Sequence, residues 1–336
     1  MNYMRIIFKK FKARMIVGCI LAVIALLAVS VIVFINQASF GRTPRGERLE
    51  RVMKSPNYRN GEFKNQHETL LMTSDRGRFS GIWEFIFRKI DGLRPEQAVK
   101  AIKTDLRKID RNEEILVWFG HSSYLIQTGG KRILVDPVFC MASPVSFVNK
   151  PFKGTELYTP DDMPDIDYLV ISHDHWDHLD YNTVKKLKDR IGAVICPLGV
   201  GEHFEYWGFD KERLIELDWN EDANLAPGFM IHCLPARHFS GRGLTANQSL
   251  WASFLLETPS QKIYIGGDGG YDTHYAEIGN RFPDIDLAIL ENGQYNEEWS
   301  LIHLMPQYMA QTARDLKAKR VLTVHHSKYA LAKHRW

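Results

Sequence analysis

Four side chains of the types that bind metal ions lie within six residues of one another in this 336-residue chain. They are His173, His175, Asp177 and His178, in the run SHDHWDHLD that follows the apolar residues 168–171. Imidazole nitrogen and carboxylate oxygen both bind zinc at about 2.0–2.2 Å. Alternate residues of an extended loop point the same way, so His173 and His175 can hold one ion. Asp177 and His178, displaced by a turn towards a helix, can reach a second ion. A solvated loop that gathers these residues by chance is the alternative, and the strand-end position disfavours it.

Two ions need more than four ligands, and three later segments offer them, each directly after an apolar run. The donors are His238, Asp268 and His325, with His326 as a neighbouring competitor for the last place. Each of these donors alone is weak evidence for a metal site. A lone histidine is more often a satisfied polar group, and Asp268 lies among four glycines that can form a plain turn. The recurrence of strand, ligand and loop favours all three together.

The elements that must position these residues are mostly strands. Alternating or continuous apolar runs predict strands at 115–119, 123–128, 132–137, 168–171, 193–196, 230–234, 253–257, 262–265, 287–290 and 320–324. The Gly129-Gly130 pair predicts a two-residue hairpin loop. Amphipathic stretches predict helices over 181–190 and 306–319. Strands therefore outnumber helices, and the expected fold is α/β, a four-layer αββα sandwich in one domain over residues 111–336.

The N-terminal region predicts a membrane anchor. Residues 15–35 form a run of 21 residues without charge, and a helix of that length rises about 31 Å, roughly the thickness of the bilayer hydrocarbon. The run is longer than the apolar part of a cleaved signal peptide, which favours a single-pass, uncleaved anchor. Basic residues crowd the preceding segment 1–14, and this favours a hydrolase domain on the extracytoplasmic side. Further basic residues follow the span, so the asymmetry is weak; they are Arg42, Arg45, Arg48, Arg51 and Lys54.

Residues 36–110 differ in composition from the rest of the chain and are predicted to be a linker and a partly helical lead-in. Glycine, proline and asparagine punctuate them. A short aromatic patch at Trp83, Phe85 and Phe87 is expected to pack on the body of the protein, with an apolar lip near lipid as the alternative.

Composition excludes some classes of protein. Hydrophobic residues make up 45% and charged residues 25% of the chain, which is ordinary for a globular protein that buries a sizeable core. The formal net charge of +3 is too small to indicate a nucleic-acid partner. The four cysteines form no C-x-x-C pair, which argues against a zinc ribbon.

The motif His173-x-His175-x-Asp177-His178, followed by His238, Asp268 and His325, resembles the metallo-β-lactamase superfamily of binuclear metallohydrolases. The resemblance covers residues 115–330. Within the superfamily the chain is similar to the N-acylphosphatidylethanolamine-hydrolysing phospholipases D and their bacterial relatives. The segments that carry this likeness are WFGHSS (118–123), LVDPVF (134–139), GDGGY (267–271) and HHSKYALA (325–332).

The resemblance implies a role for each ligand. His173, His175 and His238 would hold one zinc ion, Asp177, His178 and His325 the other, and Asp268 would bridge both. His325 is preferred to His326 because it directly follows the strand. His303 matches a further family histidine near the substrate, where it would be a proton donor or a phosphate contact; a surface histidine is the alternative. Relatives of this branch continue beyond the position of Trp336, so an incomplete wall of the substrate pocket is expected.

The expected function is that of a membrane-anchored, two-zinc phosphodiesterase on a lipid or lipid-like substrate, with other divalent metals as alternatives to zinc. Two cations about 3.5–4 Å apart acidify a bridging water to hydroxide, which attacks the phosphodiester. Asp177 or Asp268 can orient that nucleophile, and His303 can protonate the leaving oxygen. A lactonase or other ester hydrolase on the same centre, and a metal-binding protein without catalysis, are the competing interpretations. The sequence predicts no oligomeric state.

Overall fold

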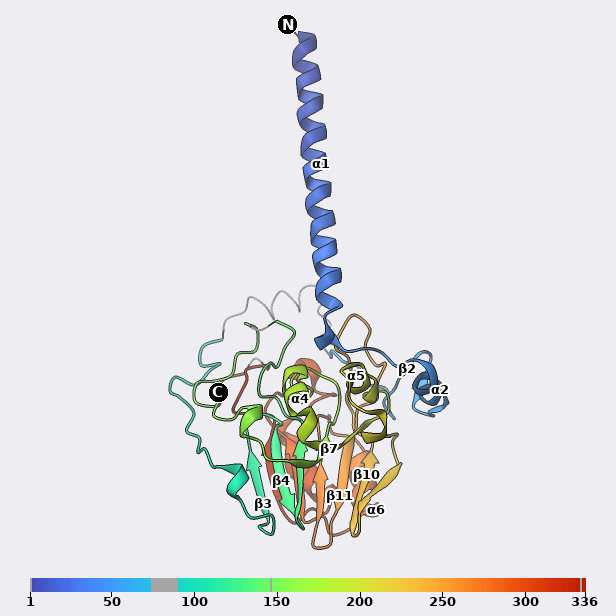
Figure 1. Cartoon of the computed structure of the whole chain (residues 1–336), viewed down its shortest axis with the longest axis vertical. Coiled ribbons are helices and arrows are strands. Elements are labelled where there is room, and N and C mark those ends of the chain that lie inside the picture. Colours follow the sequence, from blue (N-terminus) through green and yellow to red (C-terminus); the bar gives the residue numbers. More distant parts are fainter. Residues whose placement is uncertain (1, 74–89, 146, 333) are drawn as a thin grey trace. The chain divides into compact units, whose positions relative to one another are not determined.

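The computed structural model describes residues 2–73, 90–145, 147–332 and 334–336 (Figure 1). These residues form two compact units, Met1–Phe40 and Gly41–Trp336. The aromatic residues Trp83, Phe85 and Phe87 lie outside the described part of the chain, so their packing stays a prediction.

The first unit is helix α1 (Asn2–Ile35), which continues into a 3-10 turn at Ala38–Phe40. Its stretch Lys10–Ile35 is long and apolar enough to cross a membrane, by length and composition. Apolar side chains such as Leu21, Ile24 and Leu27 are exposed around it, and an all-round apolar helix is typical of a membrane span.

The second unit contains two six-stranded sheets. The first sheet consists, in spatial order, of β3 (Ile115–Trp118), β4 (Tyr124–Thr128), β5 (Lys131–Val135), β6 (Ile166–Val170), β7 (Ile191–Pro197) and β8 (Leu214–Leu217). The second consists of β14 (Val321–Val324), β13 (Leu287–Glu291), β12 (Lys262–Ile265), β11 (Ser253–Glu257), β10 (Phe229–Leu234) and β9 (Asp222–Ala226).

Each sheet combines antiparallel and parallel pairs. β3, β4 and β5 are antiparallel, and β5 to β8 are parallel. In the second sheet β9 to β12 are antiparallel, and β12 to β14 are parallel. Thr128 pairs with Lys131, so the predicted hairpin at Gly129-Gly130 is confirmed.

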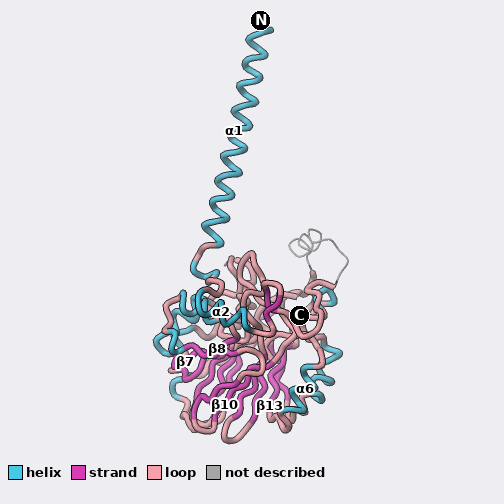
Figure 2. Tube along the Cα trace, turned by 90° about the vertical axis from the view of Figure 1, so that its right-hand side faces the viewer, coloured by secondary structure: helices cyan, strands magenta, loops and turns pink. Residues whose placement is uncertain are grey.

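Three apolar layers hold the sandwich together. Along strand β5, successive side chains alternate between two of these layers. Ile133 and Val135 pack in the core between the sheets, whereas Leu134 packs in the outer core under the helices. On the outer face of the first sheet lie α4 (Tyr181–Leu187) and α5 (Gly201–Tyr206), and on that of the second lie α6 (His274–Arg281) and α7 (Met309–Asp315) (Figures 1 and 2). The predicted αββα sandwich is confirmed.

Both predicted helices are present but shorter. Helix α4 passes into a 3-10 turn at Lys188–Arg190, and a 3-10 turn at Pro306–Tyr308 precedes α7. The prediction missed β8, β9, α5 and α6. Strand β9 is an edge strand of sequence DANLA, and α6 contains Gly279 and Asn280, so local propensity hides both and tertiary packing decides them.

The compact unit begins at Gly41, so much of the segment expected to be a linker and lead-in lies within it, and the boundary at residue 110 stays a prediction. Helix α2 (Gly46–Lys54) and the hairpin of β1 (Tyr58–Arg59) and β2 (Glu62–Phe63) belong to the compact unit. Val52 and Phe63 are fully buried in the core between the sheets. Because glycine and proline are frequent in this segment, its composition resembles that of a linker. A few buried apolar residues are nevertheless enough to fix it on the sandwich.

Arg48 on α2 fixes that helix electrostatically. Its guanidinium lies 2.6 to 2.9 Å from carboxylate oxygens of Glu202, Glu205 and Glu216, and only 8% of the Arg48 side chain is exposed. Removing one partner of a buried ion pair leaves uncompensated charge in the interior.

We therefore expect Arg48→Ala to lower the free energy of unfolding by about 3–5 kcal/mol. The measurement is urea unfolding of the full chain in detergent, followed by tryptophan fluorescence. Arg51→Ala is the matched control, since the Arg51–Glu221 pair is about half exposed and is expected to contribute less than about 1 kcal/mol. Equal losses in the two variants would contradict this assignment.

Candidate metal centre

The loop after β6 carries the first group of candidate ligands. His173 is buried, and the chain then turns, with the backbone N–H groups of His178 and Leu179 both donating to the carbonyl of His175. Asp180 ends the loop by accepting a hydrogen bond from Asn182 N at the start of α4. The turn separates the loop into two pairs of donors that face different points, as the spacing predicts.

Three ring nitrogens converge at the first point. His175 Nδ1 lies 2.9 Å from His173 Nε2 and 3.3 Å from His238 Nε2. His238 comes from the loop after β10 in the other sheet. Nitrogen ligands of one tetrahedral zinc ion, each about 2.0–2.1 Å from it, lie about 3.3 Å apart. The spacing therefore fits a single cation.

A hydrogen bond at one ring nitrogen of His238 decides which of its nitrogens is free to bind a metal. His238 Nδ1 lies 2.7 Å from the carbonyl oxygen of Ile302, and a carbonyl can only accept, so Nδ1 carries the proton and Nε2 has a free lone pair. Burial lowers the pKa of His238 to about 3. The ring is therefore neutral, which is the form that binds metal.

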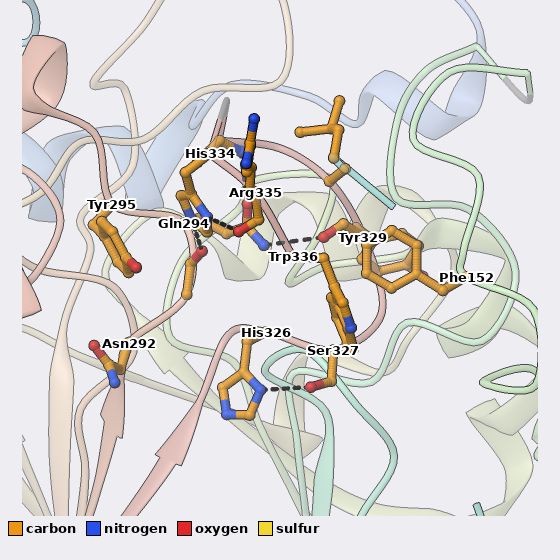
Figure 3. A pocket seen from close by; sticks show the side chains of 14 residues that line it. Phe152, Asn292, Gln294, Tyr295, His326, Ser327, Tyr329, His334, Arg335 and Trp336 are labelled. Carbon is orange, nitrogen blue, oxygen red and sulfur yellow. Dashed lines mark hydrogen bonds between the residues drawn. The ribbon is translucent and has the colours of Figure 1, made fainter. Parts of the chain in front are cut away.

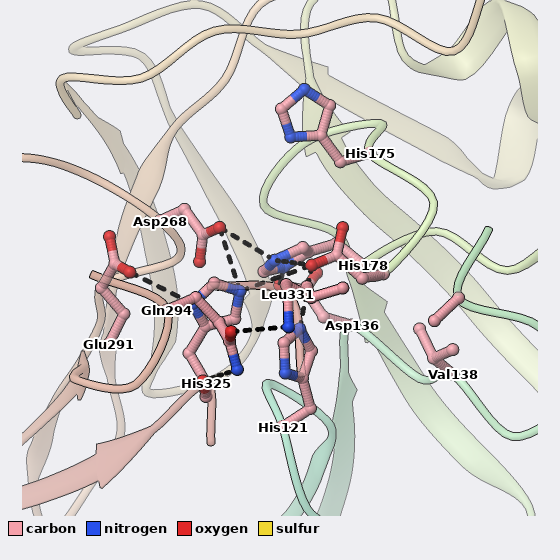
Figure 4. Close-up of polar contacts among 12 residues, drawn as sticks. His121, Asp136, Val138, His175, His178, Asp268, Glu291, Gln294, His325 and Leu331 are labelled. Atoms are coloured by element: carbon pink, nitrogen blue, oxygen red, sulfur yellow. Dashed lines mark hydrogen bonds and ion pairs between the residues drawn. The ribbon is translucent and has the colours of Figure 1, made fainter. Parts of the chain in front are cut away.

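The second point gathers Asp177, His178 and His325; the two histidines are labelled in Figure 4. Asp177 Oδ2 lies 3.4 Å from His325 Nε2 and 3.8 Å from His178 Nε2. His325 directly follows β14, so this group also draws on both sheets. The two nitrogens and the carboxylate oxygen are the donor types that a second zinc ion prefers.

Asp268 lies between the two points. Its Oδ2 is 3.2 Å from His178 Nε2, 3.3 Å from His325 Nε2 and 3.8 Å from His238 Nε2 (Figure 4). Its Oδ1 is buried and has no hydrogen-bond partner among the described residues. An unpaired buried carboxylate oxygen is costly, and a cation at this position would remove the cost. The residues present therefore fit a pair of metal ions.

The charges of the site favour cations as well. Burial by itself lowers the pKa of His325, but Asp268 and the hydrogen bond to Asp177 outweigh it and raise that pKa to about 10. The pKa of His178 is raised well above its usual value in the same way. A field that holds protons on buried imidazoles also attracts a divalent cation, whose binding would displace those protons.

Carboxylates behind the ligands orient two of the rings. His178 Nδ1 lies 2.8 Å from Asp136 Oδ2, and His325 Nδ1 lies 3.1 Å from Glu291 Oε2. Contacts of this kind direct the opposite ring nitrogen towards a metal. The sequence interpretation did not assign Asp136 or Glu291 to the site. Asp136 directly follows β5 and Glu291 ends β13, and the candidate ligands also come at the ends of strands. A search of strand ends could therefore have found both carboxylates.

His121 is a third residue that the sequence interpretation left out of the site. It is fully buried, and its Nε2 lies 2.9 Å from Asp177 Oδ2. Burial, together with the charge of His325, lowers the pKa of His121 to about 3. Its backbone pairs with that of the other sheet, since His121 N donates to the His326 carbonyl and His325 N donates to the His121 carbonyl. His121 thus closes the seam between the sheets at the ligands.

Backbone strain concentrates here. His121, Asp136 and His325 have φ values of 54°, 41° and 67°, in the left-handed region that residues other than glycine rarely occupy. Such conformations persist where surrounding contacts enforce them, and they cluster at functional sites.

The structure places His303 beside the centre rather than on the surface. Its Nδ1 lies 2.8 Å from Glu291 Oε2 and 3.9 Å from Asp268 Oδ2. Its ring is nearly parallel to that of His325, with centroids 5.5 Å apart. About 14% of the side chain is exposed, so a bound molecule can reach it.

His326 points elsewhere. It lines a separate cavity of about 280 Å³ formed with the C-terminal residues, and its Nδ1 lies 2.7 Å from Ser327 Oγ (Figure 3). Its Nε2 faces the carbonyl of Thr323. The structure therefore brings His325, and not its neighbour, to the other six predicted ligands.

The segment 41–73 supports two ligand loops. The Asn65 side chain donates to the His238 carbonyl at 2.8 Å and accepts from His238 N at 3.1 Å. Arg42 N donates to His203 Nδ1, and His203 Nε2 lies 3.1 Å from Asp174 Oδ2, between two ligands of the first loop. Gly41 has φ +71°, and a Cβ there would lie 2.0 Å from His203 Nδ1. Only glycine allows this approach.

A cavity of about 590 Å³ adjoins the same segment. It is lined by residues 59, 60 and 62–71 together with His238, Asn247 and Trp251. Polar side chains predominate among its lining residues, and it lies beside a candidate ligand.

Residues 131–326, more than half of the chain, match the family model of the β-lactamase superfamily domain. The chain belongs to the metallo-β-lactamase superfamily. The expected fold and family are thus confirmed.

Relatives within this superfamily indicate the general activity. An uncharacterised protein of Mycobacterium tuberculosis is 37% identical over 84% of this chain and 77% of its own length. The N-acyl-phosphatidylethanolamine-hydrolyzing phospholipase D 1 of Caenorhabditis elegans is 29% identical over 64% of each chain, so this chain spans less than two thirds of that enzyme. A metal-dependent hydrolase of Pyrobaculum aerophilum is 27% identical over 64% of this chain and 85% of its own. The protein is a metal-dependent hydrolase of the metallo-β-lactamase superfamily.

The adjacent histidines provide a matched test of the ligand set. His325→Gln is expected to weaken binding of one ion by more than the roughly 10–100-fold that loss of a supporting contact costs. His326→Gln should retain the metal affinity of the wild type. Competition with a chromogenic chelator measures both. Loss of metal from the His326 variant alone would reverse the assignment.

Proposed function

We propose that this protein is a membrane-anchored phosphodiesterase that uses two zinc ions and cleaves a lipid phosphodiester in the manner of a phospholipase D. The observation that carries the proposal is the position of Asp268 Oδ2, which lies within 3.8 Å of nitrogens from both ligand groups. Histidine nitrogen with carboxylate oxygen suits zinc, although other divalent metals accept the same donors.

In this proposal each predicted ligand keeps its role. His173, His175 and His238 would hold one ion, Asp177, His178 and His325 would hold the other, and Asp268 would serve both. A pair of such ions would acidify water and stabilise negative charge on phosphate oxygens. A phosphodiester suits this chemistry because its charge increases on those oxygens during attack.

The remaining steps belong to side chains of the protein. Asp177 and Asp268 accept hydrogen bonds from the attacking water and orient it. The water oxygen forms the new bond to phosphorus as the bond to the leaving alcohol oxygen breaks. His303, partly exposed beside Asp268 and in its imidazolium form, donates a proton to that oxygen, and the proton that the attacking water loses passes to solvent. The products are a phosphate monoester and an alcohol.

The lipid character of the substrate rests on two observations. One relative bears the name of a phospholipase D that hydrolyses N-acylphosphatidylethanolamine. The other is α1, whose stretch Lys10–Ile35 would cross the bilayer and hold the enzyme at a lipid surface. Neither observation requires a nucleic-acid partner.

Turnover by the full chain in detergent tests this function. We expect hydrolysis of bis-p-nitrophenyl phosphate and of N-acylphosphatidylethanolamine in mixed micelles, and loss of both activities on treatment with a chelator. Asp268→Asn keeps the side-chain size and is expected to lower kcat/KM at least about 100-fold, since it removes charge from both ions. Chelator-sensitive cleavage of a homoserine lactone alone would favour a lactonase, and no turnover with metals bound would favour a metal-binding protein.

The basic residues before the span favour an extracytoplasmic hydrolase domain. Protease added to intact spheroplasts is therefore expected to digest residues 41–336. A domain that is digested only after the membrane is opened would place it in the cytoplasm.

A further inference from the structure

We propose that Glu291 is a positioning residue that fixes the tautomer of both His325 and His303. One carboxylate would thereby couple retention of a metal ion to proton donation in the reaction. The part that concerns His303 rests on the function proposed above, whereas the part that concerns His325 needs only a metal.

The carboxylate of Glu291 is held rigidly at the end of β13. It is 3% exposed. Its Oε1 accepts hydrogen bonds from Gly269 N at 2.7 Å and from Leu304 N at 3.1 Å. Gly269 follows Asp268, and Leu304 follows His303, so this oxygen also fixes the backbone beside two site residues.

The second oxygen faces two imidazoles. Glu291 Oε2 lies 2.8 Å from His303 Nδ1. It lies 3.1 Å from His325 Nδ1 (Figure 4). An ionised carboxylate only accepts hydrogen bonds, so both Nδ1 atoms carry protons. The two rings are nearly parallel, with an angle of 13° between them. Both Nε2 atoms therefore lie on the side of the rings away from Glu291.

The consequences differ for the two rings. His325 Nε2 faces Asp177 and Asp268, and a cation that displaced its proton would find there the lone pair that a metal ligand requires. His303 keeps Nε2 for a bound molecule, because its Nδ1 is committed to Glu291. Glu291 thus acts on metal and substrate through different histidines.

Glutamine at this position separates the proposal from a purely structural role. Glu291→Gln preserves the size of the side chain, and its amide oxygen can still accept from Gly269 and Leu304. Its NH₂ group then faces the two histidines and needs acceptors there, which moves each proton from Nδ1 to Nε2. In the opposite orientation of the amide, its NH₂ group would face the N–H groups of Gly269 and Leu304. These are also donors, so no hydrogen bond could form there. A protonated Nε2 cannot bind the ion.

We expect Glu291→Gln in the full-length protein to bind one of its two zinc ions about 10–100-fold more weakly, and the cobalt(II)-loaded protein to lose the absorption of one site. With the phosphodiester substrate, kcat should fall while KM changes little. Glu257→Gln is the matched control, because Glu257 ends strand β11 of the same sheet and has no contact with the site. His303→Gln should lower kcat and leave both ions bound.

Wild-type affinity for both ions and an unchanged cobalt spectrum in Glu291→Gln would overturn the proposal. A measurement on the wild type covers the case in which that variant does not fold. In the ¹⁵N spectrum of histidine-labelled wild type, the signal that His303→Gln removes should show a protonated Nδ1; an unprotonated Nδ1 would refute the inference. If no phosphodiester is cleaved but Glu291→Gln still loses an ion, the proposed function fails while the role of Glu291 at His325 stands.

Discussion

Confinement of several carboxylates in one dry volume is the constraint on which the rest of this structure depends. Asp136, Asp177, Asp268 and Glu291 meet where the ends of the two sheets approach each other, and their side chains are at most 16% exposed. Buried negative charge is stable only when positive charge and hydrogen bonds compensate it. The surrounding histidines, and the cations that they would hold, supply that compensation. The left-handed backbone conformation of three site residues costs free energy, and these compensating contacts outweigh that cost.

The sequence predicted the parts of the fold that carry strong local signals. Ten strand-like runs, the Gly129-Gly130 hairpin and the ligand motif all have short-range patterns, and the structure contains each element. Helix α6 and strand β9 were missed because their residues have weak intrinsic preferences and are fixed by neighbours distant in sequence. Glycine and proline in residues 41–73 suggested a linker, since composition does not show that Phe63 fills the core or that Asn65 binds a distant loop.

The predicted ligands share with Asp136 and Glu291 a position at the end of a strand. His238, Asp268 and His325 come just after apolar strands, and a donor of unusual type at that point is visible in one dimension. The importance of Glu291 depends on what lies opposite it in space, which is a property of the packed sheets. His303 lies in a loop without regular structure, so only its contacts in the folded chain, with Glu291, Asp268 and the ring of His325, distinguish it from a surface histidine. Sequence thus reveals donors more readily than the groups that orient them.

The seam between the two sheets has a consequence for biosynthesis. Four candidate ligands emerge from the ribosome early, on the first sheet, whereas His238, Asp268 and His325 belong to the second and arrive last. Helix α1 precedes all of them. A nascent chain can therefore form much of its first sheet while neither candidate metal position is complete. The full candidate ligand set exists only once residue 325 has been added, so the centre can be assembled only after the strands of both sheets have been synthesised.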